Sequence, residues 1–440
     1  MSAEGSISDF EDSLPEFSTS LLVEQLVGGD NMRAAYKRVL KNRGKGGVDG
    51  MEAEDLESHL QVHWARIKSD ILSGRYRASA VRGVEIRKSN GGTRLLGIPT
   101  VQDRLIQQAL YQVVSPLFDP HFSAQSYGFR PGRSAHQAVQ QARAYQQEGK
   151  RIVVDMDLEK FFDTVPHDKL MSLVRARVKD RQVLKLIHSF LKSGILLGGV
   201  QSVPEKGTPQ GSPLSPLLSN ILLDVLDKEL ETRGHCFVRY ADDCNIYVGT
   251  KRSGTRVLSS ISSWLEAELS LKVNQEKSAV GRASGRTFLG YSFTGGTNPR
   301  IRVPSKSIKR LRSKLKRVFR WGKGRNVKKF VAEDLNPVLR GWINYFRLAE
   351  TKQFTEDLDG WIRRRLRVII WRQWKRNWRR LKNLMKLGLS EERAVRSAFN
   401  GRGPWWNSGA SHMNQALNNQ YFEKMDLISL TKQLRKLRTQ

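Results

Sequence analysis

The stretch Phe237-Val-Arg-Tyr-Ala-Asp-Asp-Cys-Asn-Ile-Tyr-Val248 decides how this chain folds. Its apolar residues form two short runs on either side of Asp242 and Asp243, which predicts two strands that meet at a turn. A solvated Asp-Asp turn explains the two acids as well as a functional site does. The stretch alone therefore predicts a β-hairpin and leaves the role of its acids open.

A second strand that carries acids is predicted earlier in the chain, at Arg151-Ile-Val-Val-Asp-Met-Asp-Leu158. Strand side chains alternate, so Asp155 and Asp157 fall on one face. A carboxylate at the end of an apolar strand is costly unless it is solvated or holds a cation. Two such sets of carboxylates suit two divalent cations about 4 Å apart, as in nucleotidyl transfer. Oxygen ligands favour Mg²⁺, with Mn²⁺ as a substitute, over Zn²⁺.

The charge of the chain predicts a polyanionic partner. Its 440 residues include 75 Lys and Arg against 43 Asp and Glu, and residues 301–440 carry +25 of the net +32. Eight of the ten tryptophans also lie in residues 321–406, interleaved with arginine. Cations for phosphates and rings for stacking are typical of nucleic-acid-binding modules. The alternative is a helical bundle with a solvated basic face.

Composition excludes several other classes of protein. The two cysteines, Cys236 and Cys244, cannot make a disulfide scaffold or a zinc site of cysteine pairs. No apolar run approaches the roughly 18 residues of a membrane span, and the first basic residue is Arg33, which fits no signal or transit peptide. Residues 1–20 are acidic and rich in Ser, and we expect them to be disordered. A cytoplasmic protein without a membrane partner is expected.

The order of these motifs resembles the palm of reverse transcriptases, in the form carried by bacterial group II intron-encoded proteins. The resemblance rests on Asp157 with Phe162, on Gly207-Thr-Pro-Gln-Gly-Ser-Pro-Leu-Ser-Pro216, and on Tyr240-Ala-Asp-Asp243. Further segments match in order at residues 84–99, 126–133, 271–277, 288–291 and 339–346. Together they extend over nearly the whole chain after about residue 20.

This resemblance implies an α+β fold of the right-hand polymerase type. Fingers and palm are expected in residues 21–300, an α-helical thumb or maturase domain in 301–383, and a small basic DNA-binding region in 384–440. Helices are predicted over residues 134–147 and 216–231, and over the basic segment 306–320. Many relatives continue into an endonuclease domain with cysteine pairs. Because this sequence has none, the endonuclease-lacking, group IIC-like class is expected.

The resemblance also assigns roles around the acids. Asp157, Asp242 and Asp243 are expected to hold the two metals, with Asp155 as the competitor for the role of Asp157. Lys277 is the candidate general acid for the departing pyrophosphate. The alternative is a lysine that is only solvated, as is more common after a turn such as the one expected at Val273-Asn274.

Further residues are expected to bind substrate and nucleic acid. Phe162 would leave no room for a 2′-hydroxyl, unless it is ordinary core. Lys88 and Arg94 would fold over the triphosphate from a fingers hairpin. Gln210 would lie against nucleotide and template, unless its loop only caps the next helix. Nucleic acid is expected to contact basic residues of the helical part: Arg340, Arg363, Arg364, Arg367 and Arg372.

The implied function is an RNA-directed DNA polymerase that is also a group II intron maturase. Its expected partners are group II intron RNA, an RNA template with a DNA primer, target DNA, dNTPs and a second copy of the chain in a homodimer. It would work in a ribonucleoprotein of the bacterial cytoplasm. Two alternatives stay open: a splicing-only RNA-binding maturase, and a reverse transcriptase recruited to host defence or DNA repair.

Overall fold

The computed structural model describes residues 22–87, 91–197, 200–202, 206–208, 211–351 and 353–439. The segment 1–20, expected to be disordered, lies outside them. Contacts divide the chain into two compact units, of which the first extends to Tyr145 and resumes over Lys150–Gly281. The second consists of Gln146–Gly149 with the chain from Arg282 onward. No helix among the described residues is long and apolar enough to cross a membrane.

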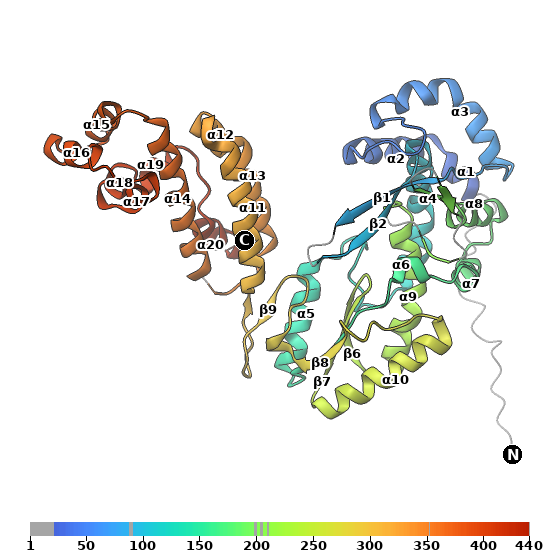
Figure 1. The fold of residues 1–440 in the computed structure, drawn as a ribbon. Helices are drawn as coiled ribbons and strands as arrows, with labels where there is room; N and C mark the ends of the chain where they lie inside the picture. Colours follow the sequence, from blue (N-terminus) through green and yellow to red (C-terminus); the bar gives the residue numbers. More distant parts are fainter. Residues whose placement is uncertain are drawn as a thin grey trace, which may run out of the picture. The chain divides into compact units, whose positions relative to one another are not determined.

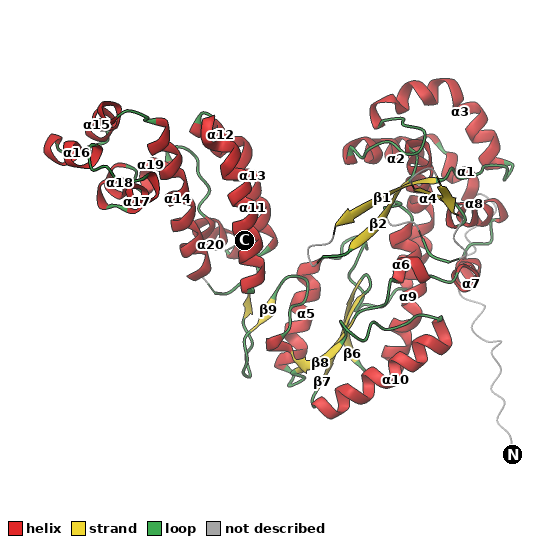
Figure 2. Cartoon of the chain, viewed as in Figure 1, coloured by secondary structure: helices red, strands yellow, loops and turns green. Residues whose placement is uncertain are grey.

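The first unit contains an antiparallel sheet built from the two acidic stretches (Figures 1 and 2). Its strand order is β6-β7-β3-β8, with bounds β3 Ile152–Met156, β6 Cys236–Tyr240, β7 Asp243–Val248 and β8 Ala279–Arg282. The predicted hairpin is β6 and β7, and the predicted second acidic strand is β3. Val154, Phe237 and Ile246 are fully buried in the core.

Two amphipathic helices cover this sheet, α9 Ser215–Thr232 and α10 Lys251–Leu269. In α10, Val257, Ile261 and Leu265 recur every four residues and are buried, so one apolar stripe faces the core. Helix α10 contacts β3 and β7, and α9 contacts β6. The predicted helix at 216–231 is thus confirmed as α9.

A second sheet in the same unit has the order β2-β1-β4-β5. Its strands are β1 Val81–Arg87, β2 Thr93–Ile98, β4 Ile195–Leu197 and β5 Val200–Ser202. Around the sheets lie the remaining helices of this unit: α1 Leu22–Val27, α2 Gly29–Asn42, α3 Leu56–Leu72, α4 Val101–Phe118, α5 Ala135–Gln147, α6 Phe161–Thr164, α7 His167–Arg177 and α8 Arg181–Leu191. Helix α5 confirms the helix predicted at 134–147.

In the part that the structure describes, the second unit is helical apart from one short strand pair, β9 Ser292–Phe293 with β10 Ile301–Arg302. This pairing ties residues 282–300 to the second unit, so the division falls earlier than the boundary expected at residue 300. The helices are α11 Ser305–Trp321, α12 Val327–Phe330, α13 Asn336–Tyr345, α14 Gln353–Gln373, α15 Asn377–Lys386, α16 Glu391–Ala398, α17 Pro404–Gly409, α18 Ser411–Ala416, α19 Asn419–Glu423 and α20 Leu430–Arg438.

One hydrophobic core serves this whole helical unit. In α11, Leu311, Leu315 and Phe319 recur every four residues and are buried, while the other faces carry most of the basic side chains. The same core extends through Leu417 and Leu434. Residues beyond 384 therefore pack with the preceding helices, and the predicted α+β fold with a helical part after the sheets is confirmed.

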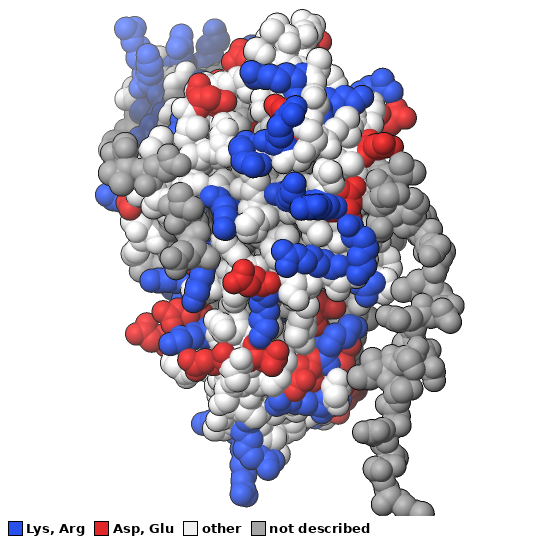
Figure 3. Space-filling model, turned by 90° about the vertical axis from the view of Figure 1, so that its right-hand side faces the viewer, with Lys and Arg blue, Asp and Glu red and all other residues white. Residues whose placement is uncertain are grey.

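Charge is distributed as the sequence indicates. Figure 3 shows a face on which Lys and Arg are interspersed with Asp and Glu. The excess of positive charge belongs to residues 301–440. The basic surface for a polyanion is therefore expected on the helical unit.

Candidate functional site

The palm-like sheet brings the three predicted metal ligands to one end. Asp157 directly follows β3, while Asp242 lies in the turn before β7 and Asp243 is the first residue of β7. Met156 pairs with Cys244 across the antiparallel strands β3 and β7. Asp157, the residue after Met156, and Asp243, the residue before Cys244, therefore lie next to this pair at the same edge of the sheet. Asp155 lies further inside β3, where it pairs with Asn245.

The electrostatics of this edge show how closely the acids crowd. Desolvation first, and then the negative charges of Asp242, Asp157 and Asp155, raise the pKa of Asp243 to about 6, while Lys277 opposes the shift. Burial thus disfavours the ionised form of Asp243, and the neighbouring carboxylates add electrostatic repulsion. A cation at this edge would relieve that repulsion.

Lys277 supplies a positive charge at the edge. Its Nζ donates to Oδ2 of Asp157 at 2.6 Å, although the lysine side chain is mostly exposed. The backbone of Asp157 is held as well, because its N–H donates to Ser278 Oγ at 3.0 Å and its carbonyl accepts from the N–H of Asn274 at 2.8 Å. The lysine therefore pairs with the acid that the sequence assigns to a metal.

The donor set fits a hard divalent cation, because it consists of carboxylate oxygens in a crowded, negative environment. Across the described ranges, however, no group of three or more His, Cys, Asp or Glu side chains is close enough to hold a metal ion as it stands. The ammonium of Lys277 occupies one oxygen of Asp157 in this arrangement. The proposed ligands therefore lie at one edge of the sheet, but they are not close enough together to coordinate a metal ion.

A buried arginine lies beneath the acidic turn. Arg239 on β6 is fully buried, and its guanidinium donates to both carboxylate oxygens of Asp227 at 2.7 and 2.5 Å. Its Nη1 also donates to the carbonyl of Ala241, inside the turn, at 3.0 Å. The same Nη1 reaches Asn220 Oδ1 at 3.1 Å, and Nη2 reaches Ser126 Oγ at 2.8 Å. The network fixes the backbone that carries Asp242 and Asp243.

The turn needs this support because its backbone is unusual. Ala241 has φ +57°, a left-handed conformation that a non-glycine residue rarely adopts. Gly128 packs against it so closely that a Cβ there would lie 2.3 Å from the Ala241 nitrogen. Asn220 in turn donates to the Gly128 carbonyl at 2.8 Å. Gly128, from the motif at residues 126–133, therefore packs against the turn that carries Asp242 and Asp243.

Sequence reasoning missed Arg239, Asp227 and Asn220. The available signal was a single charge, Arg239, in the otherwise apolar stretch before the acidic turn. A charge in a buried strand needs a partner of opposite sign, and α9 offers two acids about one turn apart, Asp224 and Asp227. Nothing in the sequence identifies which acid that partner is.

Phe162 borders a cavity rather than being wholly enclosed. The half-buried ring lines a cavity of about 490 Å³, together with Leu96, Phe129 and Gly211. Its backbone carbonyl accepts from the N–H of Thr208, and Gly207 approaches so closely that a Cβ there would lie 2.8 Å from the Phe162 oxygen. The loop predicted to contact the nucleotide therefore begins directly beside the backbone of Phe162.

Three of the predicted substrate contacts cannot be placed in full. Lys88 and Gln210 lie outside the described residues. Arg94 lies on the β1–β2 hairpin opposite Ile86, but its side chain is not among those described. Their roles stay predictions.

The arginines predicted to bind nucleic acid differ in exposure. Arg340 on α13 and Arg372 on α14 are exposed, while Arg363 and Arg364 on α14 are half-buried. Arg367 does not stand on the open helix surface that its role as a nucleic-acid contact suggests. It is only 7% exposed, and its Nε and Nη2 donate to the carbonyl of Leu417 at 3.0 and 2.8 Å. The cause is the packing of α14 against the helices that follow residue 404.

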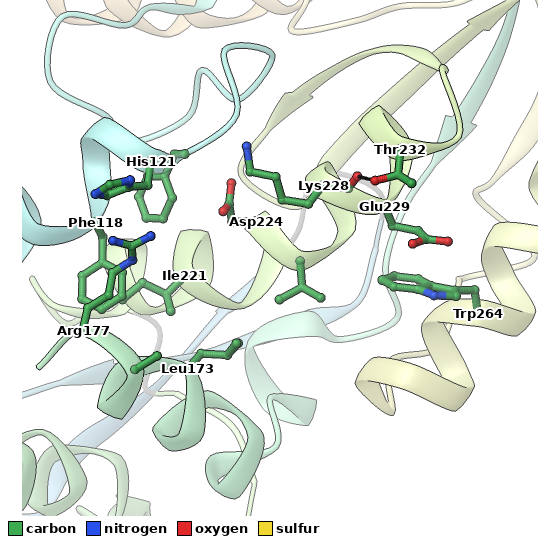
Figure 4. Close-up of a pocket in the computed structure, with 13 residues that line it drawn as sticks. Phe118, His121, Leu173, Arg177, Ile221, Asp224, Lys228, Glu229, Thr232 and Trp264 are labelled. Atoms are coloured by element: carbon green, nitrogen blue, oxygen red, sulfur yellow. Dashed lines mark hydrogen bonds between the residues drawn. The ribbon is translucent and has the colours of Figure 1, made fainter. Parts of the chain in front are cut away.

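A further cavity of about 410 Å³ lies between α4, α7, α9 and α10, away from the acidic turn. Figure 4 shows Trp264 of α10 at one end, Arg177 and His121 at the other, and Asp224 with Lys228 from α9 between them. Burial lowers the pKa of His121, and the charges of Arg177 and Lys228 lower it further. None of the residues that the sequence predicted for the site lines this cavity.

Two family models match the chain in the order of the two units. Residues 86–293 match the model for reverse transcriptase (RNA-dependent DNA polymerase). Residues 308–388 match the model for the group II intron maturase-specific domain. The first match covers the edge of the sheet that carries Asp157, Asp242 and Asp243, called the acidic edge below. The second covers α11 to α15 almost entirely.

Curated relatives agree with these matches. The chain is 33% identical to protein YkfC of Escherichia coli K12, over 56% of this chain and 74% of that protein. It is 27% identical to the putative COX1/OXI3 intron 2 protein of Saccharomyces cerevisiae, over 64% of this chain and 44% of that protein. It is 35% identical to the group II intron-encoded protein LtrA of Lactococcus lactis, over 47% of this chain and 34% of that protein.

Proposed function

This chain belongs to the group II intron reverse transcriptases and maturases, and we propose that the acids gathered where β3 meets the β6–β7 turn form its polymerase centre. Membership makes it an RNA-directed DNA polymerase with a maturase domain. Reverse transcriptases generally use divalent cations. The observation that carries the proposal is the convergence of Asp157, Asp242 and Asp243 at one edge of the sheet, with the raised pKa of Asp243 as its electrostatic sign.

Asp157, Asp242 and Asp243 would hold two Mg²⁺ ions, which neutralise the triphosphate and activate the 3′-hydroxyl of the primer. Arg239 keeps the turn that presents Asp242 and Asp243 in one conformation. Lys277 would give up its bond to Asp157 when a cation binds. Its ammonium would then be free to donate a proton to the departing pyrophosphate.

The cavity beside Phe162 is the proposed place of the incoming dNTP sugar and base. The ring borders the cavity, and the small residues Gly211 and Ser212 form another part of its wall. An RNA template with a DNA primer would approach along the same sheet edge. Intron RNA would bind the helical unit, whose charge of +25 over residues 301–440 supports that assignment.

The maturase-specific match over residues 308–388 favours service to an intron over a role in host defence or repair. The three acids, all present, favour a working polymerase over a splicing-only protein. Target-DNA binding by residues 384–440, a homodimer, a bacterial cytoplasmic ribonucleoprotein and the endonuclease-lacking class stay predictions.

A pair of variants tests the assignment of the acids. Asp157→Asn removes a proposed ligand and should lower primer extension on an RNA template by more than about a hundredfold. Asp155→Asn, two residues earlier and inside β3, should keep most of the activity. Extension by purified protein at saturating dNTP and Mg²⁺ measures both. The reverse pattern would give the ligand role to Asp155.

A further inference from the structure

Three arginines of α14 line a single recess in the helical unit. Arg363, Arg364 and Arg367 border a recess of about 310 Å³, and the opposite wall is formed by α17 and the segments after it. The remaining lining residues are Gly360, Ser408, Gly409, Asn414 and Asn419. Apart from the two glycines, every lining side chain is polar, and all the charges among them are positive.

The positive charges of the recess have no ion-pair partner within the described ranges. Among the described residues, none of the three arginines forms an ion pair with an acid. Asp359, on the same helix, accepts hydrogen bonds from the N–H groups of Leu430 and Thr431 at 2.8 and 3.1 Å. Glu423 is paired with Lys432 at 2.7 Å. The nearby acids are thus engaged elsewhere.

Arg367 forms the deepest charge of this recess. Burial, and then the positive charge of Arg363, lower the pKa of Arg367 to about 10. The guanidinium is still a cation at neutral pH. Among the described residues its hydrogen bonds go to the neutral carbonyl of Leu417, and its Cζ lies 5.7 Å from the centre of the Phe422 ring. A buried cation beside a second cation is costly unless an anion joins them.

Arg364 is held in place before any ligand arrives. Its Cζ lies 4.1 Å from the centre of the Trp405 ring, and its Nη2 donates to the Trp405 carbonyl at 3.3 Å. Gly409 leaves it room, because a Cβ there would lie 2.9 Å from Arg364 Nη2. Its Nε is buried and has no hydrogen-bond partner in the part of the chain that the structure describes. A fixed fork of this kind suits an oxyanion.

Exposed indole rings lie directly beside the recess. Trp405 and Trp406 are 46% and 48% exposed, although apolar rings of this size are usually covered. Arg365 lies 4.9 Å from the centre of the Trp405 ring, and Arg402 lies 5.0 Å from that of Trp406. Rings and guanidinium groups together offer stacking surfaces for nucleotides next to a phosphate.

We propose that this recess seats one backbone phosphate of a bound RNA, with Arg363, Arg364 and Arg367 around the phosphodiester and the neighbouring nucleotide on the exposed side of Trp405. The inference rests on the proposed function insofar as the RNA is the intron. It adds that residues 404–419, placed by sequence in a DNA-binding region, form half of an RNA site.

The test uses Arg363, because its removal should not harm the fold. No hydrogen bond joins Arg363 to the described residues, and its charge opposes that of Arg367. Arg363→Gln should therefore keep the melting temperature of the full chain. Arg379→Gln is the matched control, because Arg379 is an exposed arginine of the same unit on α15, outside the recess. Arg367→Ala is avoided, because it would strip the Leu417 carbonyl of its donors.

The measurement is the dissociation constant of a structured intron RNA as a function of salt. Arg363→Gln should weaken binding about tenfold at low salt and flatten the logarithmic salt slope by about 0.7 to 0.9, the value for one phosphate contact. The control should change the dissociation constant by less than about twofold. Equal effects of the two variants, or none from Arg363→Gln, would overturn the recess as a site.

A second arm identifies the phosphate. Single methylphosphonate substitutions, which remove one backbone charge, are scanned through a short RNA. One position should weaken binding to the wild type clearly more than binding to Arg363→Gln, which keeps only two of the three arginines at that phosphate. If the variant loses affinity only for DNA of the same sequence, the assignment to RNA is wrong.

These experiments distinguish a failure of the proposed maturase function from a failure of the proposed phosphate site. If the wild-type chain itself does not bind intron RNA, the proposed maturase function fails. If the wild type binds and Arg363→Gln binds equally well, only the recess fails.

Discussion

At the scale of single residues, the pKa values and ion pairs of the acidic edge depend on carboxylates that the fold places close together. Asp243 has a pKa of about 6 because of desolvation and three neighbouring carboxylates, and Lys277 pairs with Asp157 at 2.6 Å. A protein that bears such repulsion without a cation gains binding energy when a cation arrives. The same argument applies to the arginines of α14, with the signs reversed.

Phe162 is the residue whose role the structure narrows most. Its ring borders a cavity of about 490 Å³, whereas its neighbour Phe161 is buried. Phe162→Val should raise the use of rNTPs relative to dNTPs by about tenfold or more, because the smaller side chain admits a 2′-hydroxyl. Single-nucleotide incorporation with each substrate measures the ratio.

Phe161→Leu serves as the control for Phe162→Val. It should lower stability and leave the ratio of rNTP to dNTP use as it is, because this ring packs in the core. If Phe162→Val lowers stability and leaves the ratio of rNTP to dNTP use unchanged, Phe162 is an ordinary core residue.

At the scale of elements, the sequence predicted well what local pattern determines. The hairpin β6–β7, strand β3 and helices α5, α9 and α11 follow from periodicity and turn residues. Strand β1, by contrast, pairs in parallel with β4, more than a hundred residues later. No local pattern marks such a partner. The burial of Arg367 was missed for the same reason, since it depends on Leu417.

The network of β6 and α9 gives a prediction at this scale. Arg239→Met leaves Asp227 buried without its partner, which should lower the free energy of unfolding by about 3 to 5 kcal/mol. Arg239→Met with Asp227→Leu should recover much of that loss, because no buried charge remains. Urea unfolding measures both variants.

Polymerase activity should not recover in the double variant, because the Ala241 carbonyl still lacks its donor and the turn is no longer held. Primer extension tests this point. A double variant that regains both stability and activity would reduce Arg239 to an ordinary ion-pair partner.

At the scale of the whole molecule, chemistry and affinity are assigned to different units. The acids belong to the first unit, while +25 of the net charge of +32 lies in residues 301–440. The sequence predicted this division because composition changes along the chain. It could not predict that residues beyond 384 share one core with the preceding helices, since the apolar positions of short helices do not reveal their partners.

The central claim is that the acidic turn performs polymerisation while the basic unit supplies RNA affinity. Asp242→Asn tests it most directly, with primer extension on an RNA template and the affinity for intron RNA measured on the same preparation. We expect extension to be lost and the dissociation constant for RNA to stay within about twofold of the wild type, because phosphate contacts carry the affinity. Extension by Asp242→Asn at the wild-type rate would contradict the account.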